Sequence, residues 1–566
     1  MGRAGYKDRD GSPESPTWFQ AIVWKRNLLF AVLCAGGLAT IAASMPHPGR
    51  LADAPRARLH VSRDSDFQHT LARVDAAFRH TWASKHLVPA AAADDLTVAR
   101  RLALALMGTI PSLEEVRALE AMAPAERLDC WVDRVLGDRR HHDYFAERLA
   151  RAYVGADAGP FIFYRRRRLV RWLSDQLRDG RPYDAMVRQL IASNGFATSE
   201  PPTNFLVYTI DPDQKNFHVD ERKLAARVSR AFLGARIDCA ECHDHPFEPW
   251  KQSDFEGLAA FFTGTRQSFT GIRDTDSGQP LEVEDRASGK LRSVAAQVPF
   301  DRQLLPERGD ARVRLAAWVT DARNQHFSQA MANRVWALLL GRGLVDPVDD
   351  IRAEQPVPPA LAILADDFAM HGFDVQRLVR LIAASEVFRL DSRANPTFAG
   401  HEITPEHEAA WAVFPLRRLR SEQVAGAIEQ ATSLETLDAD THLLVRLRVL
   451  IEEKQFTERF GDAGEAELTD AGGTIPQRLL MANGAIVRNR TSNNPLFNAS
   501  ARIALLAAGD REAVEVAYLA VLSRRPTQPE TQHFIARMAG VAKARAARLE
   551  DLCWALINSV EFSWNH

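Results

Sequence analysis

Two thiols and two imidazoles lie within seven residues of the chain, in the stretch CAECHDH that begins at Cys239. Cys239, Cys242 and His243 have the C-x-x-C-H spacing at which two thioether bonds hold a haem and the adjacent histidine ligates its iron. With His245, these side chains are also ligand types that suit zinc. The sequence therefore predicts a site for haem c at Cys239, Cys242 and His243, with a metal site that includes His243 and His245 as the alternative.

The haem prediction also requires a second axial ligand if the iron is to be a low-spin electron carrier. Met331, His218 and His326 are the options, and the sequence assigns none of them.

A purely structural elbow is the third possibility. In that case Cys239 and Cys242 form a local disulfide, His243 and His245 form hydrogen bonds with the backbone, and Phe247 and Trp250 lie in the core. A thioredoxin-type redox site is disfavoured because no βαβ pattern surrounds the motif.

Two helices are expected to position this stretch. Apolar residues at helical spacing run from Leu224 to Phe232, and Gly234 marks a break after them. Pro246 and Pro249 forbid a helix directly after the motif, and a second helix is expected from Ser253. The cysteine stretch is therefore predicted to form an elbow between two helices.

The whole chain is predicted to be mainly α, with two helical modules and a short irregular or β-containing linker behind an N-terminal transmembrane helix. Further on, the acidic turn at Asp346, Asp349 and Asp350 is interpreted as a helix cap rather than as a hard-cation site. The predicted division is a cytoplasmic tail at 1–26, a membrane segment at 27–45, a helical module with the C-x-x-C-H motif at 65–263, a linker at 264–304 and a second helical module at 305–562.

The segment Asn27–Met45 carries no charge over 19 residues and follows Lys25 and Arg26. That length crosses a hydrocarbon core of roughly 30 Å, and the basic flank places the short tail in the cytoplasm. A cleaved signal peptide with its site near 42–44 is the alternative. Either way, the bulk of the chain is expected to be extracytoplasmic, in the periplasm, and the uncleaved form to be a single-pass protein of the cell membrane.

Composition excludes some classes of protein. The net charge is only −2, from 71 basic and 73 acidic side chains, so no global field favours nucleic acid or a membrane surface. Five cysteines are too few for a disulfide framework. The chain contains no G-x-S-x-G, H-E-x-x-H or phosphate-binding glycine loop, so no hydrolase or transferase constellation is found and enzymatic activity is left open.

Longer motifs carry a family resemblance. CAECHDHPFEPWKQSDFEGLAAFF and ALMGTIPSLEEVRAL resemble the planctomycete-type cytochrome-c-like family, domain of unknown function 1549. NRVWALLLGRGLVDPVDDI, LVRLIAASEVFRL, LSRRPTQPE and CWALINSVEFSWNH resemble its usual partner, domain of unknown function 1553. The resemblance implies this domain order and an exported, often membrane-attached protein, but no reaction.

The sequence thus predicts an exported, membrane-anchored protein that binds haem covalently at the C-x-x-C-H site and transfers electrons, with a redox or envelope protein as its partner. The alternative is a non-redox envelope or surface protein. Its cysteine and histidine elbow would bind zinc or be structural, and its second module would bind a partner.

Overall fold

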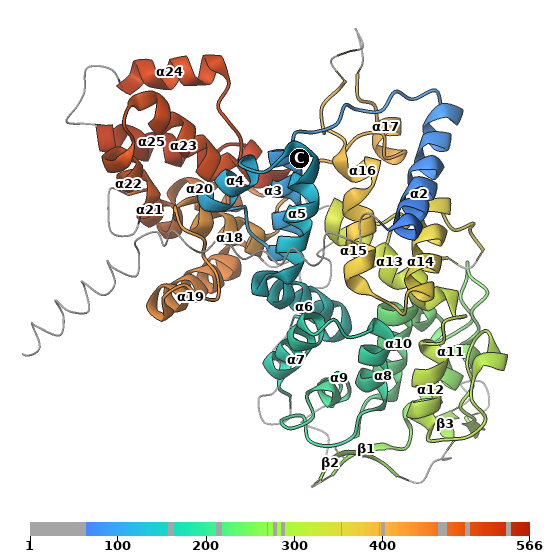
Figure 1. Cartoon of the computed structure of the whole chain (residues 1–566). Coiled ribbons are helices and arrows are strands. Elements are labelled where there is room, and N and C mark those ends of the chain that lie inside the picture. The colour runs from blue at the N-terminus through green and yellow to red at the C-terminus, as the bar shows by residue number, and fades with distance from the viewer. Residues whose placement is uncertain are drawn as a thin grey trace, which may run out of the picture.

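The computed structural model describes residues 64–156, 164–210, 218–268, 270–275, 280–284, 289–352, 354–395, 397, 402–461, 473–492, 498–538 and 545–566. Helices predominate and strands are few and short, so the prediction of a mainly α fold is confirmed (Figure 1). The predicted membrane segment 27–45 lies outside the described residues. Within the described part of the chain, no helix is both long enough and apolar enough to span a bilayer.

The helices before the predicted linker are α2 (Ser65–Ser84), α3 (Asp95–Met107), α4 (Leu113–Glu120), α5 (Pro124–Gly137), α6 (Arg139–Val154), α7 (Arg166–Arg178), α8 (Tyr183–Ala192), α9 (Asn204–Val207), α10 (Glu221–Leu233) and α11 (Gln252–Ala259). Those directly after it are α12 (Ala311–Val319), α13 (Gln325–Leu340), α14 (Pro359–Met370), α15 (Val375–Ala384), α16 (Glu386–Arg389) and α17 (Pro405–Ala409). The C-terminal helices are α18 (Ser421–Ala431), α19 (Leu443–Phe460), α20 (Ile475–Asn483), α21 (Ala485–Thr491), α22 (Ala499–Leu506), α23 (Asp510–Leu522), α24 (Gln528–Met538) and α25 (Arg545–Ile557).

Two antiparallel hairpins occupy the predicted linker. β1 (Thr265–Ser268) pairs with β2 (Gly271–Asp274), and β3 (Leu281–Glu284) pairs with β4 (Leu291–Val294). A third pair joins β5 (Arg417–Arg418) to β6 (Trp564–Asn565), which ties the chain end back to the start of the C-terminal helices.

The buried side chains form two clusters. The larger runs from Phe67 to Phe414 and includes residues on both sides of the hairpins. Tyr183 of α8, for example, stacks on Phe327 of α13 with ring centroids 5.1 Å apart. The helices of the predicted cytochrome-c-like module and the first helices of the second module therefore pack into one core, while the module boundaries themselves stay a prediction.

The smaller core joins the C-terminal helices to the end of α3 and to α4, through Leu104, Ile110, Leu113 and Val116. Figure 1 shows these C-terminal helices, in orange and red, gathered on one side of the molecule. Ser112 begins α4 with a capping box to Glu115, as the sequence predicts.

Candidate cofactor site

Helix α10 leads into the cysteine elbow. Asp220 caps its N-terminus by accepting a hydrogen bond from the Lys223 amide, and buried Leu224 and Val228 fix its inner face. The helix ends at Gly234, which has φ +60°, and a Cβ there would approach Ile351 and Ala330 at 3.1–3.2 Å. Glycine is thus required both by the backbone conformation and by the closeness of α13.

The elbow begins with a 3₁₀ turn at Ile237–Ala240 and ends where α11 starts at Gln252. The predicted placement of the C-x-x-C-H stretch between two helices is therefore confirmed.

Cys239, Cys242 and His243 are all exposed on this elbow, and both cysteines are free thiols. The Nδ1 atom of His243 lies 2.7 Å from the carbonyl oxygen of Asp244. Because a carbonyl only accepts, Nδ1 must carry the proton, which leaves the Nε2 lone pair unprotonated in the neutral ring. This tautomer suits an iron ligand, and two accessible thiols suit thioether attachment, so the donor set fits haem c.

His245 is used differently. Its Nδ1 accepts hydrogen bonds from the amides of Phe247, at 3.1 Å, and Glu248, at 3.0 Å, and its own amide donates to the Trp250 carbonyl at 2.8 Å. Nδ1 is therefore occupied, and Nε2 carries the proton in the neutral ring. His245 shapes the turn, and it would have to give up these bonds to offer Nδ1 to a metal.

The structural alternative predicted a disulfide, backbone hydrogen bonds at His243 and His245, and two buried aromatic rings. The hydrogen bonds of both histidines are confirmed, but two other points are wrong. The sulfurs are not joined, and Phe247 is 82% exposed. Trp250, as predicted, is buried. Phe247 points outward because Pro246 and the two hydrogen bonds to His245 fold the chain into a tight turn whose tip cannot reach the core.

Ion pairs link the start of the elbow to other parts of the chain. Arg230 pairs with Asp238 at 2.5 Å and lies 3.6 Å from Asp349, while Arg236 pairs with Asp349 at 2.8 Å. Burial alone would raise the pKa of Asp349, but the hydrogen bond from Arg236 and the two positive charges outweigh it and lower that pKa.

The interpretation of Asp349 as a helix cap is therefore wrong. The next helix begins ten residues later, at Pro359, and the carboxylate instead binds two arginines that lie more than a hundred residues earlier in the chain. The neighbouring amide of Ile351 donates to the carbonyl of Gly234 at 2.6 Å. Local sequence patterns contain no signal for a pairing over this separation.

An aromatic group lies behind the elbow. The ring of Trp250 is 6.0 Å from that of Phe300, which is 4.9 Å from Trp318 and 4.5 Å from His326. Burial lowers the pKa of His326.

The other two options for a second axial ligand lie elsewhere. Met331 is buried in α13, and His218 forms an isolated backbone bridge with Arg266 of β1. The structure therefore brings together the motif cysteines and His243, but it leaves the second axial ligand unassigned.

Zinc fits the elbow less well. Within the described residues, a group of three or more possible ligand atoms that all lie within 4.8 Å of one another occurs at Asp66, Asp367 and His371, and the elbow forms no such group. Burial, helped by the nearby Asp238 charge, raises the pKa of the Cys239 thiol. A raised pKa is the opposite of what a thiolate ligand or a thioredoxin-type nucleophile requires.

In the group at Asp66, Asp367 and His371, the two carboxylates already bind an arginine side chain. The guanidinium of Arg377 donates to Asp66 at 2.6 Å and to Asp367 at 2.9 Å. A metal ion would have to displace this arginine, so the group is best explained as an ion-pair network.

Two family models match successive segments of the chain. Residues 73–267 match the family model PSCyt2, a protein of unknown function (DUF1549), and residues 311–442 match PSD1, a protein of unknown function (DUF1553). The two segments therefore match the two families in the order that the resemblance predicts. No curated protein and no solved structure gives a significant match. The elbow lies in the PSCyt2 segment, whereas Asp349 and Ile351 lie in the PSD1 segment.

Proposed function

We propose that this chain is an exported, membrane-anchored protein that carries covalently attached haem at Cys239, Cys242 and His243 and takes part in electron transfer. The observation that carries the proposal is the state of His243. Its Nδ1 proton is held by the Asp244 carbonyl and its Nε2 carries no proton, while the two cysteines that precede it in the motif are exposed. Bound haem would supply a one-electron couple at its iron.

The surroundings of the motif support a role in exchange with a partner protein. The thiols, His243 and Phe247 lie at the surface, where an electron donor or acceptor can approach closely. Phe247 also exposes an apolar ring next to the motif. Contact with an apolar macrocycle would remove this ring from water, which is energetically favourable.

Anchoring is the second part of the proposal. Residues 27–45 would cross the cell membrane, with the described residues on the extracytoplasmic side. Covalent haem attachment is an extracytoplasmic process, so the predicted location agrees with the predicted cofactor.

The test is to produce the full chain in a host that matures c-type cytochromes. We expect a Soret band, a pyridine haemochrome spectrum and a haem-staining band that survives denaturing electrophoresis. Cys242→Ala should lower the covalent haem content strongly, while Cys130→Ala, a cysteine outside the motif, should keep it. A colourless wild-type protein would refute haem binding.

One alternative has support of its own. The His245 hydrogen bonds and the Asp349 ion pairs hold the elbow without any cofactor. This favours a non-redox envelope protein with a structural or zinc-binding elbow and a second module that binds a partner. Metal analysis of a colourless sample would separate the zinc-binding form from the purely structural one.

A further inference from the structure

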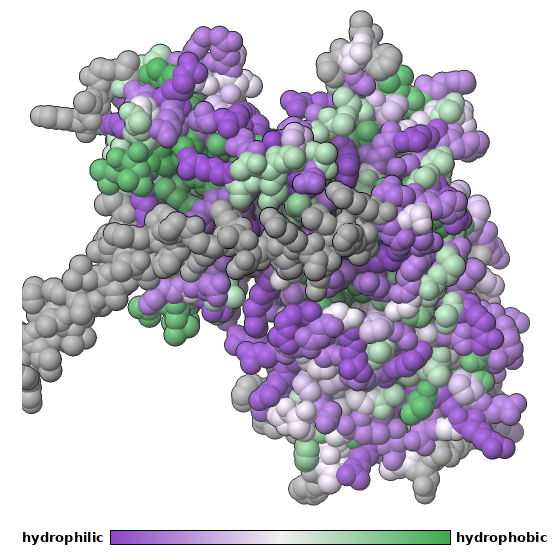
Figure 2. Space-filling model, viewed as in Figure 1, coloured by the Kyte–Doolittle hydropathy of each residue, from purple (hydrophilic) through white to green (hydrophobic). Residues whose placement is uncertain are grey.

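Helix α19 exposes an unusual number of large apolar side chains. Five of them lie on its first two and a half turns, with exposed fractions between 48% and 72%: Leu443, Leu444, Leu447, Leu450 and Ile451. At 3.6 residues per turn, these positions fall within an arc of about 120°. We call this set the α19 leucine face, and Figure 2 shows it as a hydrophobic group at the lower left of the molecule.

The opposite side of the same helix is already packed. Phe456 and Phe460 are buried in the smaller core. Glu452, in the middle of α19, also turns away from the leucine face, since it pairs with Arg490 at 2.5 Å. A surface helix normally has one apolar face and one polar face, so a second apolar face indicates a second contact.

A cleft of about 370 Å³ borders this face. It lies between α19 and the N-terminus of α6. Its lining includes Leu447 and Leu450, three guanidinium groups (Arg139, Arg140 and Arg446) and three carboxylates (Asp143, Asp438 and Glu453). The cleft is therefore apolar along the leucines and carries charges of both signs elsewhere.

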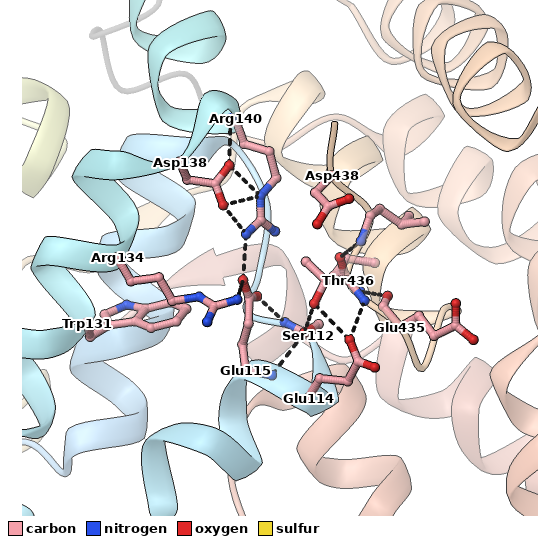
Figure 3. A network of polar contacts seen from close by, with 12 residues as sticks. Ser112, Glu114, Glu115, Trp131, Arg134, Asp138, Arg140, Glu435, Thr436 and Asp438 are labelled. Atoms are coloured by element: carbon pink, nitrogen blue, oxygen red, sulfur yellow. Dashed lines mark hydrogen bonds and ion pairs between the residues drawn. The ribbon is translucent and has the colours of Figure 1, made fainter. Parts of the chain in front are cut away.

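Arg140 is the distinctive member of the lining. Its Nε and one terminal nitrogen, Nη2, bind Asp138 and Glu115, as Figure 3 shows. The other terminal nitrogen, Nη1, is buried and has no hydrogen-bond partner. A buried guanidinium N–H without an acceptor is costly, and a phosphate oxygen in the cleft would satisfy it.

We propose that the α19 leucine face docks on the surface of an anionic lipid bilayer. The leucines would enter the upper acyl region, while Arg446, Arg139 and the free nitrogen of Arg140 would bind lipid phosphates. The outward face up to Lys454 carries only aliphatic and basic side chains, which is the composition of an interfacial helix.

The chain itself argues for lipid as the occupant rather than another protein. An uncharged stretch of 19 residues, 27–45, precedes the described part. The 19 residues from 46 to 64 could span about 60 Å when extended, which lets the anchored chain bring α19 to the same bilayer. This proposal rests on the anchor of the proposed function and is independent of the haem.

The experiment uses the full chain reconstituted in vesicles of phosphatidylcholine and phosphatidylglycerol that contain a photoactivatable phospholipid. Cross-linked peptides are identified by mass spectrometry. We expect lipid cross-links in residues 443–451, about tenfold fewer of them in the double variant Leu447→Asp, Leu450→Asp, and a clear loss when phosphatidylglycerol is omitted. The matched control is Leu291→Asp, which changes an equally exposed leucine on β4 and should cross-link like the wild type.

Cross-links within 27–45 provide an internal reference. If they form in every variant while residues 443–451 stay unlabelled, the anchor stands and docking by α19 is refuted. If 443–451 is labelled without 27–45, docking stands and the anchor is refuted. A doubling of mass by light scattering that the double variant abolishes, together with α19-to-α19 cross-links, would assign the face to a second copy and overturn the proposal.

Discussion

Replacing Asp349 by asparagine tests how firmly the PSD1 segment holds the cysteine elbow. The change keeps the size of the side chain and removes its charge, so Arg236 loses its carboxylate partner at 2.8 Å while Arg230 keeps Asp238 at 2.5 Å. The side chains of Asp349 and Arg236 are 27% and 34% exposed, so water and salt reduce the energy of the pair. We therefore expect a coupling of about 1 kcal/mol, the upper end for a partly exposed pair.

Local opening is the appropriate readout, because the elbow is a small part of a chain with two cores and can open by itself. The amide of Ile351, which donates to Gly234, and that of His245, which donates to Trp250, report on the two ends of the elbow. A loss of about 1 kcal/mol corresponds to hydrogen exchange about fivefold faster at these amides. Asp350→Asn is the matched control, because Asp350 has only a loose contact with Arg352, at 3.9 Å.

The effect should depend on pH in a defined direction. The pKa of Asp349 is lower in the folded protein than its usual value of 3.8, so its contribution is fully present above that value and is lost as the pH falls through the folded pKa. Wild type and Asp349→Asn should therefore converge in strong acid. Equal exchange rates at neutral pH, or no coupling in a double-mutant cycle with Arg236→Gln, would refute the reasoning.

Two further predictions concern the junction of the two cores. Glu115 is fully buried and binds Arg140 at 2.5 Å and Arg134 at 3.4 Å, so Glu115→Ala should cost about 3 kcal/mol; an unchanged urea midpoint would contradict this. Burial raises the pKa of Glu453 from 4.5 to about 7, so the folded state binds the extra proton and wild-type stability should fall by about 3 kcal/mol as the pH rises through that range. Glu453→Gln should remove this slope in melting temperature against pH, and parallel slopes for the two proteins would show that Glu453 does not titrate there.

The local elements near the site could be predicted because their signals lie within a few residues. Gly234 ends α10 in the left-handed conformation, as a glycine directly after an apolar helical run predicts. The Ser112 capping box follows the same logic. The free thiols, by contrast, could not be predicted, since spacing alone allows haem, zinc or a disulfide.

The contacts that hold the site could not be predicted from the sequence. Asp349 looked like a local cap because acidic residues near a turn usually cap a helix, whereas its partners Arg230 and Arg236 come from another part of the chain. The exposure of Phe247 was missed for a related reason. An aromatic residue near a motif is normally assigned to the core, and only the hydrogen bonds to His245 show that the turn points it outward.

These contacts also give a physical reason for the presence of both segments in one chain. The elbow leaves α10 at Gly234, and that glycine is packed against Ala330 and Ile351 of the PSD1 segment. Asp349 of the same segment neutralises two arginines under the motif. A PSCyt2 segment alone would expose this surface and leave both arginines without that carboxylate. The conformation that presents Cys239, Cys242 and His243 is therefore a property of the pair of segments, and substitutions at Asp349 should alter the elbow although they lie outside the motif.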